Sequence, residues 1–172
     1  MNSPELASAW VRRWADLVTA GPVLDVASGA GRHAGFFAGR GLEVVAVDRD
    51  PQEIPGVQFV QADLEGGPWP FGEKRFAAIV VTNYLHRPLL PVIERALGDG
   101  GVLLYETFMV GNERFGRPSN PAFLLEPGEL LHAFPALEAV AFEQGYVERP
   151  KPAMVQRLCA RRGAIGSARI AL

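Results

Sequence analysis

The sequence has little cysteine, little excess of charge of either sign and no long apolar run. Cys159 is the single cysteine among 172 residues. This excludes an intramolecular disulfide and a multi-cysteine zinc cluster, and we predict no metal site. The 17 basic and 19 acidic side chains leave a net charge of −2. So small a charge gives no general attraction to nucleic acid or to an anionic membrane.

Targeting signals are also lacking. The first residues, Met-Asn-Ser-Pro-Glu, have neither the basic region nor the apolar region of a signal peptide. No apolar segment reaches the length of about 18 residues that a membrane-spanning helix needs. We therefore expect a cytoplasmic protein that has neither a membrane nor a nucleic-acid partner.

The length and composition predict one globular domain. The chain fits the usual domain size of roughly 100–200 residues, and 48% of its residues are hydrophobic. Glycine and proline together make 33 of the 172 residues, well above the average of roughly 12%. We predict a single domain over residues 1–162, a flexible tail over 163–172, and a monomer or a homodimer.

Short apolar runs predict five parallel strands. Their residues are apolar in succession rather than alternately, which is typical of strands that are covered on both faces. The runs are residues 23–27, 43–48, 57–61, 76–82 and 101–108. Helices are predicted after the first and fourth of them, at about 32–40 and 88–97. Strands that alternate with helices indicate right-handed crossovers and a parallel sheet.

The last third of the chain predicts an antiparallel hairpin. Two strand-like runs, residues 137–148 and 153–161, are separated by only four residues, too few for a crossover. The predicted fold class is therefore α/β: a doubly wound, Rossmann-like seven-stranded sheet, mostly parallel, with an antiparallel C-terminal hairpin strand. Residues 68–72, Pro-Trp-Pro-Phe-Gly, forbid a long helix after the third strand, so we expect thin cover on that side of the sheet.

An amphipathic helix is predicted before the first strand, starting at Ser3-Pro4. Its apolar positions recur at helical spacing: Leu6, Trp10, Trp14, Leu17 and Val18. Trp10 and Trp14 either pack against the sheet or form a lid over a site.

The turn after the first strand carries the most specific signal. Gly29-Ala-Gly31 lets a ligand approach the backbone closely, and the following helix presents its N-terminus to that ligand. Residues 29–34 also satisfy the dinucleotide fingerprint, so a nicotinamide-dependent oxidoreductase is one alternative. Asp25 argues against it, because a carboxylate just before the glycines would repel a pyrophosphate. It would instead suit the positively charged amino-acid moiety of S-adenosylmethionine.

Residues 25–31, Asp-Val-Ala-Ser-Gly-Ala-Gly, resemble the first motif of the class I S-adenosylmethionine-dependent methyltransferases. Ala27 stands where that family usually has its first glycine. The resemblance implies an S-adenosylmethionine cofactor. It also implies cofactor contacts from the residues of this motif: Asp25, Ala27, Ser28, Gly29 and Gly31.

Later segments extend the resemblance to about residue 105. It implies six more cofactor contacts: Asp48, Arg49, Asp63, Leu64, Thr82 and Asn83. Asp48 would accept both ribose hydroxyls, Asp63 the adenine amino group, and Leu64 would line the ring. The structural alternatives are a helix cap for Asp48, a turn acid for Asp63 and an Asx turn for Asn83.

The second half of the chain is similar to small methyltransferases of the tellurite-resistance type, in residues 83–87, 106–121 and 123–131. Methyl transfer demands no fixed catalytic triad, since the cofactor supplies the reactivity. His86 lies just past the fourth strand and is the candidate general base, with Tyr84 as the second catalytic candidate. His33 could contact cofactor or substrate.

The loop over residues 109–125 is the candidate substrate site, because loops of that length in compact domains tend to be functional. It contains Asn112, Arg114 and Arg117, and its arginines could bind an anionic substrate. The alternative is a solvated loop.

The sequence predicts a methyltransferase that acts on a small molecule. The alternatives are an NAD(P)-dependent oxidoreductase, a cofactor-binding protein without turnover, and an RNA or protein methyltransferase. The last is favoured by basic residues near the C-terminus: Arg149, Lys151, Arg157, Arg161 and Arg162.

Overall fold

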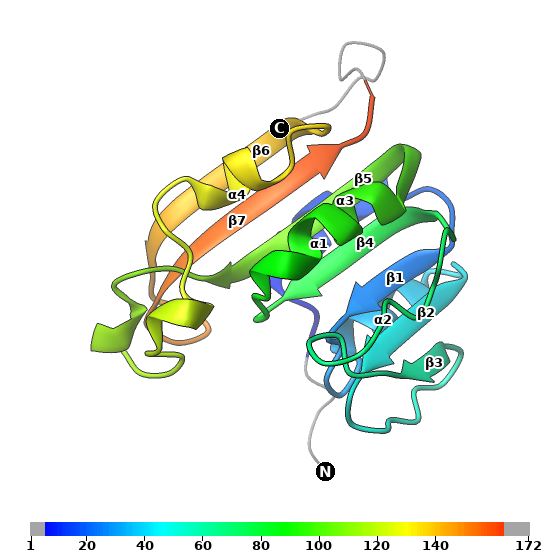
Figure 1. Ribbon diagram of the computed structural model, residues 1–172, viewed down its shortest axis with the longest axis horizontal. Helices are drawn as coiled ribbons and strands as arrows, with labels where there is room; N and C mark the ends of the chain where they lie inside the picture. Colours follow the sequence, from blue (N-terminus) through cyan, green and yellow to red (C-terminus); the bar gives the residue numbers. More distant parts are fainter. Residues whose placement is uncertain (1–5, 164–172) are drawn as a thin grey trace.

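The computed structural model describes residues 6–163, which form a seven-stranded sheet with helices on both faces (Figure 1). The strand order is β3-β2-β1-β4-β5-β7-β6. The strands are β1 (Val23–Val26), β2 (Val44–Asp48), β3 (Gln58–Gln61), β4 (Phe76–Thr82), β5 (Leu97–Phe108), β6 (Glu138–Val147) and β7 (Ala153–Arg161). Strands β1 to β5 pair in parallel, and β7 runs antiparallel to both β5 and β6. The predicted fold class is confirmed. The tail expected over 163–172 lies, apart from Gly163, outside the described residues.

Helices cover the sheet as two outer layers. They are α1 (Ala9–Trp14), η1 (Ala15–Leu17), α2 (Arg32–Gly39), η2 (Arg87–Leu89), α3 (Leu90–Ala96), η3 (Asn112–Arg114), η4 (Pro121–Phe123) and α4 (Glu129–Ala133). In the view of Figure 1, α3 and α4 lie in front of the sheet, and α1 and α2 lie behind it. Each face of the sheet carries its own apolar cluster.

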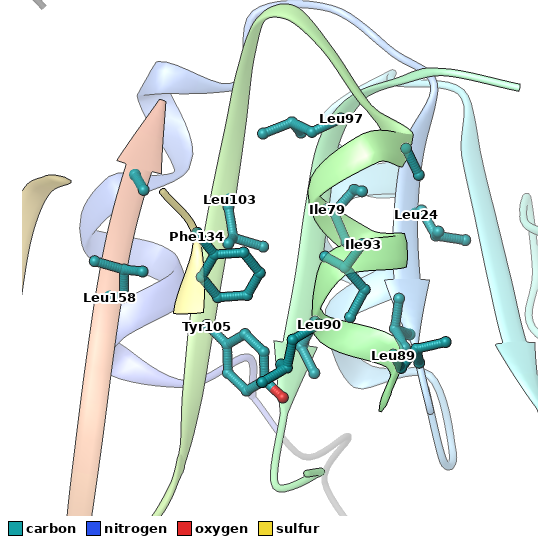
Figure 2. Packing of buried hydrophobic residues seen from close by; sticks show 14 of the residues in the cluster. Leu24, Ile79, Leu89, Leu90, Ile93, Leu97, Leu103, Tyr105, Phe134 and Leu158 are labelled. Carbon is teal, nitrogen blue, oxygen red and sulfur yellow. The ribbon is translucent and has the colours of Figure 1, made fainter. Parts of the chain in front are cut away.

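The front cluster lies between α3 and the centre of the sheet. Figure 2 shows Leu90 and Ile93 of the helix against Ile79, Leu103 and Tyr105 of β4 and β5. Ile79, Leu103 and Tyr105 have no exposed surface. Burying each such side chain contributes about 1.5–3 kcal/mol, so α3 holds β4 and β5, and with them the loops at their carboxyl ends, in place.

The N-terminal helix packs against the back of the sheet. It begins at Ala9, because the Ser8 hydroxyl accepts a hydrogen bond from the backbone N–H of Val11 (3.1 Å). Trp10 and Trp14 are 2% and 3% exposed, so they are packing residues and do not form a lid. The sequence interpretation was wrong for Leu6, which is 70% exposed. The helix start predicted at Ser3 and Pro4 lies outside the described residues.

Residues 62–75 connect β3 to β4 without a helix, as the proline and glycine content predicts. Trp69 and Phe71 cover the sheet instead. Their rings meet edge to face at 5.1 Å, and Phe71 meets Phe76 in the same way at 5.3 Å. The prediction that this side of the sheet is thinly covered was therefore only partly right, because two aromatic rings take the place of the missing helix.

The carboxyl ends of β1, β2, β4 and β5 meet at one edge of the sheet. In the register, Val26 lies beside Val47 and Val81, and Thr82 lies beside Glu106. In open α/β sheets this edge is where ligands bind, so the loops that follow these strands form the candidate site. No helix among residues 6–163 is long and apolar enough to cross a membrane.

Candidate functional site

The turn after β1 is shaped by three residues with left-handed backbone angles. Their φ values are 51° for Ala27, 52° for Gly29 and 79° for Gly31. A Cβ on Gly31 would lie 2.3 Å from Cδ1 of Ile54, so a larger residue there would displace Ile54 as well as adopt a strained φ. A Cβ on Gly29 would meet nothing within 4 Å. The backbone at Gly29 is therefore open to a ligand, whereas Gly31 is needed for packing.

Ala27 occupies a backbone conformation that costs a non-glycine residue about 1–2 kcal/mol. We expect Ala27→Gly to leave the free energy of unfolding within about 0.5 kcal/mol of wild type, because the relieved strain offsets the greater flexibility of glycine. Ala27→Val should lower it by about 2 kcal/mol, since a β-branched side chain tolerates positive φ poorly. Denaturant unfolding measures both. Ala30→Val, at an exposed position of the same turn with ordinary φ, is the control. An Ala27→Val variant as stable as that control would contradict the account.

Asp48, the last residue of β2, is tied to this turn. Its Oδ2 accepts a hydrogen bond from the backbone N–H of Gly29 (2.9 Å), and its Oδ1 accepts one from the N–H of Asp50 (3.0 Å). The residues that follow, 49–57, form no helix, so Asp48 is not a helix cap. The carboxylate is held beside the open backbone of Gly29.

Asp25 is a buried carboxylate with one unused oxygen. The side chain is 1% exposed, and Oδ2 accepts a hydrogen bond from the N–H of Ala34 (2.9 Å). Oδ1 has no hydrogen-bond partner among the described residues, and neither has the buried hydroxyl of Ser28. Burial raises the pKa of Asp25 from 3.8 to about 7, with a smaller increase from Asp48. Such orphaned polar atoms are rare in folded proteins and indicate an absent binding partner.

Asp63 forms a turn, as the structural alternative proposes. Its Oδ1 accepts hydrogen bonds from the N–H groups of Glu65 and Gly66 (3.0 Å each), and these bonds lower its pKa. The side chain is exposed, as is that of Arg49, and Leu64 is half-buried. Turn formation uses one carboxylate oxygen, so the predicted adenine contact stays a prediction for this residue.

His33 links the N-terminal segment to the end of β4. The N–H of Ser8 donates to its Nε2 (3.2 Å), so the ring proton is on Nδ1 and faces the Thr82 hydroxyl (3.3 Å). The ring is 2% exposed. Burial and the nearby Arg32 lower its pKa from 6.5 to about 4. Both ring nitrogens are engaged, so His33 is a neutral structural side chain and not a substrate contact.

The lowered pKa of His33 predicts that the free energy of unfolding depends on pH. The folded state keeps the ring neutral, so its contribution is complete above pH 6.5 and is lost as the pH falls from 6.5 towards 4. We expect His33→Gln to be destabilising at pH 7.5, and that deficit to shrink by about 3 kcal/mol at pH 4.5. Asp25 acts in the opposite direction over part of this range, so the difference between variant and wild type is what must be measured. A deficit independent of pH would contradict the assignment.

A cavity of about 270 Å³, here called the acceptor pocket, opens where the loops after β3, β4 and β5 meet. Its walls combine four polar side chains with apolar ones. They are Glu65, Asn83, Tyr84, Leu85, Thr107, Phe108, Pro118 and Phe123. Asn83, with a φ of 54°, turns the chain sharply as it leaves β4. Thr82 ends β4 directly beneath this turn.

Tyr84 stays protonated in the acceptor pocket. Its hydroxyl is buried and faces the Glu65 carboxylate, which acts on it as a hydrogen-bond acceptor although the contact is not a fully formed bond. Burial raises its pKa, and the carboxylates of Glu65, Asp63 and Asp48 raise it further. Tyr84 is therefore suited to donate a hydrogen bond and unsuited to remove a proton. His86, the other catalytic candidate, follows Leu85 and is half-buried, but it does not line this pocket.

The structure does not bring the three predicted substrate residues to the pocket. Asn112 is 2% exposed. Its amide holds the loop together, because Oδ1 accepts from the N–H of Met154 and Nδ2 donates to the Pro118 carbonyl (3.1 Å each). Arg114 and Arg117 are exposed, and neither lines the cavity. Two other residues of the same loop, Pro118 and Phe123, line the cavity instead.

Arg87, missed by the sequence analysis, fixes that wall. Its guanidinium pairs with both carboxylate oxygens of Glu129 (2.7 and 2.9 Å). It also donates to the carbonyls of Ala122 (2.9 Å) and Leu124 (2.8 Å). Those carbonyls flank Phe123, so one side chain from the end of β4 positions the far wall of the acceptor pocket.

Two of the basic residues near the C-terminus are used inside the molecule. Arg157 pairs with Glu106 and Glu143, and Arg162 donates to the carbonyls of Leu97 and Glu94. These contacts use two of the five residues of the predicted basic cluster, whereas Arg149 and Lys151 are exposed.

Comparison with known proteins agrees with this geometry. Residues 24–105 match a family model described as a methyltransferase domain. TehB from Haemophilus influenzae has a similar structure, with a TM-score of 0.75 and 15% identity. The match covers 91% of this chain and 63% of TehB, so the chain spans less than two thirds of that protein.

Other solved structures share the fold at similarly low identity. A TehB-like S-adenosylmethionine-dependent methyltransferase from Corynebacterium glutamicum is 22% identical, with a TM-score of 0.63. The match covers 88% of this chain and 86% of that one. The glycopeptide N-methyltransferase MtfA, complexed with sinefungin, is 16% identical, with a TM-score of 0.64 and coverages of 95% and 89%. No curated protein matches the sequence.

Proposed function

The chain belongs to the class I S-adenosylmethionine-dependent methyltransferases, and on that premise we propose that it methylates a small molecule held in the acceptor pocket. The observation that carries the proposal is the hydrogen bond from the N–H of Gly29 to Oδ2 of Asp48. This bond places the glycine turn and the acid at the end of β2 side by side. The acceptor pocket opens at the same edge of the sheet, beyond the ends of β4 and β5.

The residues present fit S-adenosylmethionine. The open backbone at Gly29 leaves room for a ligand, and the unpartnered Oδ1 of Asp25 and hydroxyl of Ser28 are polar atoms that a ligand could satisfy. We assign the ribose hydroxyls to Asp48 and the positively charged amino-acid moiety to Asp25. The predicted contacts of Ala27, Arg49, Leu64, Thr82 and Asn83 remain part of this proposal.

When bound, S-adenosylmethionine would supply a methyl group on a positively charged sulfur. The sulfur would keep the bonding electron pair as a nucleophile forms the new bond to the methyl carbon. The chain's own contribution is to align the nucleophile and exclude water. Tyr84 and Asn83 line the acceptor pocket and can orient the nucleophile by hydrogen bonds. His86, the base expected from the sequence, does not line the acceptor pocket, so we assign it no proton transfer.

The small-molecule class rests on the size of the pocket. Its volume of about 270 Å³ lies just below the usual range of about 300–1,000 Å³ for ligand sites.

Membership of the tellurite-resistance branch is likewise a proposal, supported by the structural similarity to TehB. The related structures include an enzyme named for N-methylation of a glycopeptide, so the fold alone does not fix the acceptor.

We further propose a single domain over residues 1–162 that works in the cytoplasm as a monomer or a homodimer, without a nucleic-acid partner. The net charge of −2 and the internal use of Arg157 and Arg162 support the last point. Light scattering of the purified protein measures the mass, and a larger assembly would contradict the proposal.

Transfer of a labelled methyl group tests the function. We expect the protein, given S-adenosylmethionine with a tritiated methyl group and a whole-cell extract, to place the label in a product below about 1 kDa, far smaller than a protein domain, that chromatography separates from unreacted S-adenosylmethionine and that does not form without the protein. Asp48→Ala should abolish the signal. Label in RNA or protein would favour that alternative, and no label in any fraction would indicate a binder without turnover.

A further inference from the structure

We propose that the methyl acceptor carries a basic nitrogen, which binds as a cation to Glu65, on a small apolar body that contacts Phe108 and Phe123. This inference rests on the proposed function and names the substrate class of the same site. It runs against the expectation of an anionic substrate bound by Arg114 and Arg117.

The first observation is the charge of the pocket wall. Among the described residues that line the acceptor pocket, Glu65 is the only one with a charged side chain. The other polar groups are the Asn83 amide and the hydroxyls of Tyr84 and Thr107, which are neutral. An anion entering this space would meet a carboxylate and no cation, whereas an ammonium group would gain a charge-assisted hydrogen bond.

The second observation is that neighbouring charges reinforce Glu65. The carboxylates of Glu65, Asp63 and Asp48 all lie close enough to the Tyr84 hydroxyl to raise its pKa, so the charged groups that act on this wall of the pocket are negative. Arg87 does not cancel it, because its guanidinium is paired with both oxygens of Glu129. Arg114 lies outside the pocket, with its guanidinium against the Phe115 ring and the Gly111 carbonyl.

The third observation is the apolar part of the pocket wall and the size of the pocket. The apolar walls come from Leu85, Phe108, Pro118 and Phe123, and Phe123 is 46% exposed. A cavity of about 270 Å³ accommodates a molecule of roughly one ring with a short side chain. Aromatic side chains can bind both a flat ring and a nearby cation. A small amine with an aromatic or aliphatic body therefore matches every wall of the pocket.

Three probes of nearly equal size test the charge preference: phenethylamine, 2-phenylethanol and phenylacetate. Each is titrated by NMR into isotope-labelled protein saturated with S-adenosylhomocysteine, so that no turnover occurs. We expect the amine to bind more tightly than phenylacetate by on the order of tenfold, with the alcohol between them. The amide signals of Asn83 and Thr107 should move on titration.

Two variants assign the preference to Glu65. In Glu65→Gln the affinity for the amine should fall on the order of tenfold. The three probes should then bind with similar affinities. Glu73→Gln, which changes an exposed glutamate just before β4 at the opposite edge of the sheet, should behave as wild type. Unchanged affinity for S-adenosylhomocysteine in Glu65→Gln shows that the variant is folded.

Three results would overturn the inference: phenylacetate binding as tightly as the amine, an amine preference that survives Glu65→Gln, or no saturable amine binding up to about 10 mM. The initial titration with S-adenosylhomocysteine distinguishes failure of the proposed function from failure of this inference. Failure of that step removes the proposed function and this inference together. Binding of S-adenosylhomocysteine without an amine preference removes this inference alone.

Discussion

Replacing Asp48 with alanine should weaken S-adenosylmethionine binding by on the order of a hundredfold, about 3 kcal/mol. The carboxylate is already held at the turn by the N–H groups of Gly29 and Asp50, so it loses little freedom when the ribose hydroxyls bind. On the proposed ribose assignment, removing it deletes two charge-assisted hydrogen bonds at once. Calorimetric titration measures the change directly.

The control for this variant is its neighbour. Asp50→Ala removes an exposed carboxylate but keeps the backbone N–H that bonds to Asp48, so affinity should stay within about twofold of wild type, the scale of an exposed charge. Asp48→Asn retains an oxygen for the N–H of Gly29 and should fall between the two. An Asp48→Ala protein that is folded and binds as tightly as wild type would contradict the ribose assignment.

Replacing Asp25 with asparagine should move stability and cofactor affinity in opposite directions. The raised pKa of about 7 means that the buried carboxylate favours folding while protonated, below its unfolded pKa of 3.8, and that this contribution is lost as the pH rises through 7. At pH 8 the neutral amide should therefore raise the free energy of unfolding by about 2 kcal/mol. This is less than the full shift implies, because the amide N–H₂ also lacks a partner.

The same substitution removes the charge that we assign to the amino-acid moiety of the cofactor. We expect S-adenosylmethionine affinity to fall by on the order of tenfold at pH 8. Asp99→Asn, at an exposed position near the start of β5, should change neither quantity. Unfolding and calorimetry on the same samples provide the measurements. An Asp25→Asn protein that is less stable than wild type at pH 8, or that binds the cofactor equally well, would contradict the assignment.

The apolar runs of the sequence predicted β1, β2, β4 and β5 because these strands are buried on both faces over most of their length. The short link before residue 153 correctly predicted the antiparallel hairpin of β6 and β7. Leu6 was misplaced because helical spacing continued beyond the true start of α1. The Ser8 hydroxyl ends that pattern by capping the helix at Ala9.

The proximity of the glycine turn to Asp48 was predictable because these residues follow neighbouring strands of a parallel sheet. The turn at 27–31 and Asp48 follow consecutive strands, and a parallel sheet places the ends of such strands together. The acceptor pocket was not predictable in this way. Glu65, Thr107 and Phe123 come from three separate loops and strands, and no local pattern connects them.

The polar residues of the long loop do not line the pocket as the sequence analysis predicted, and the folded structure explains why. Asn112 has the composition of a ligand contact, yet its partners are the N–H of Met154 and the carbonyl of Pro118. The first of these lies 42 residues away in the sequence, so sequence alone could not distinguish a structural amide from a functional one. Arg87 presents the same problem, since its contacts with Glu129 and with the carbonyls beside Phe123 arise only in the folded chain.

The central claim is that the edge of the sheet at Gly29 and Asp48 binds S-adenosylmethionine. Calorimetric titration of the purified protein with S-adenosylmethionine, S-adenosylhomocysteine and NAD tests it most directly. We predict saturable binding of both sulfur compounds, no binding of NAD, and loss of the sulfur-compound signal in Asp48→Ala. Binding of NAD without binding of either sulfur compound would contradict the account.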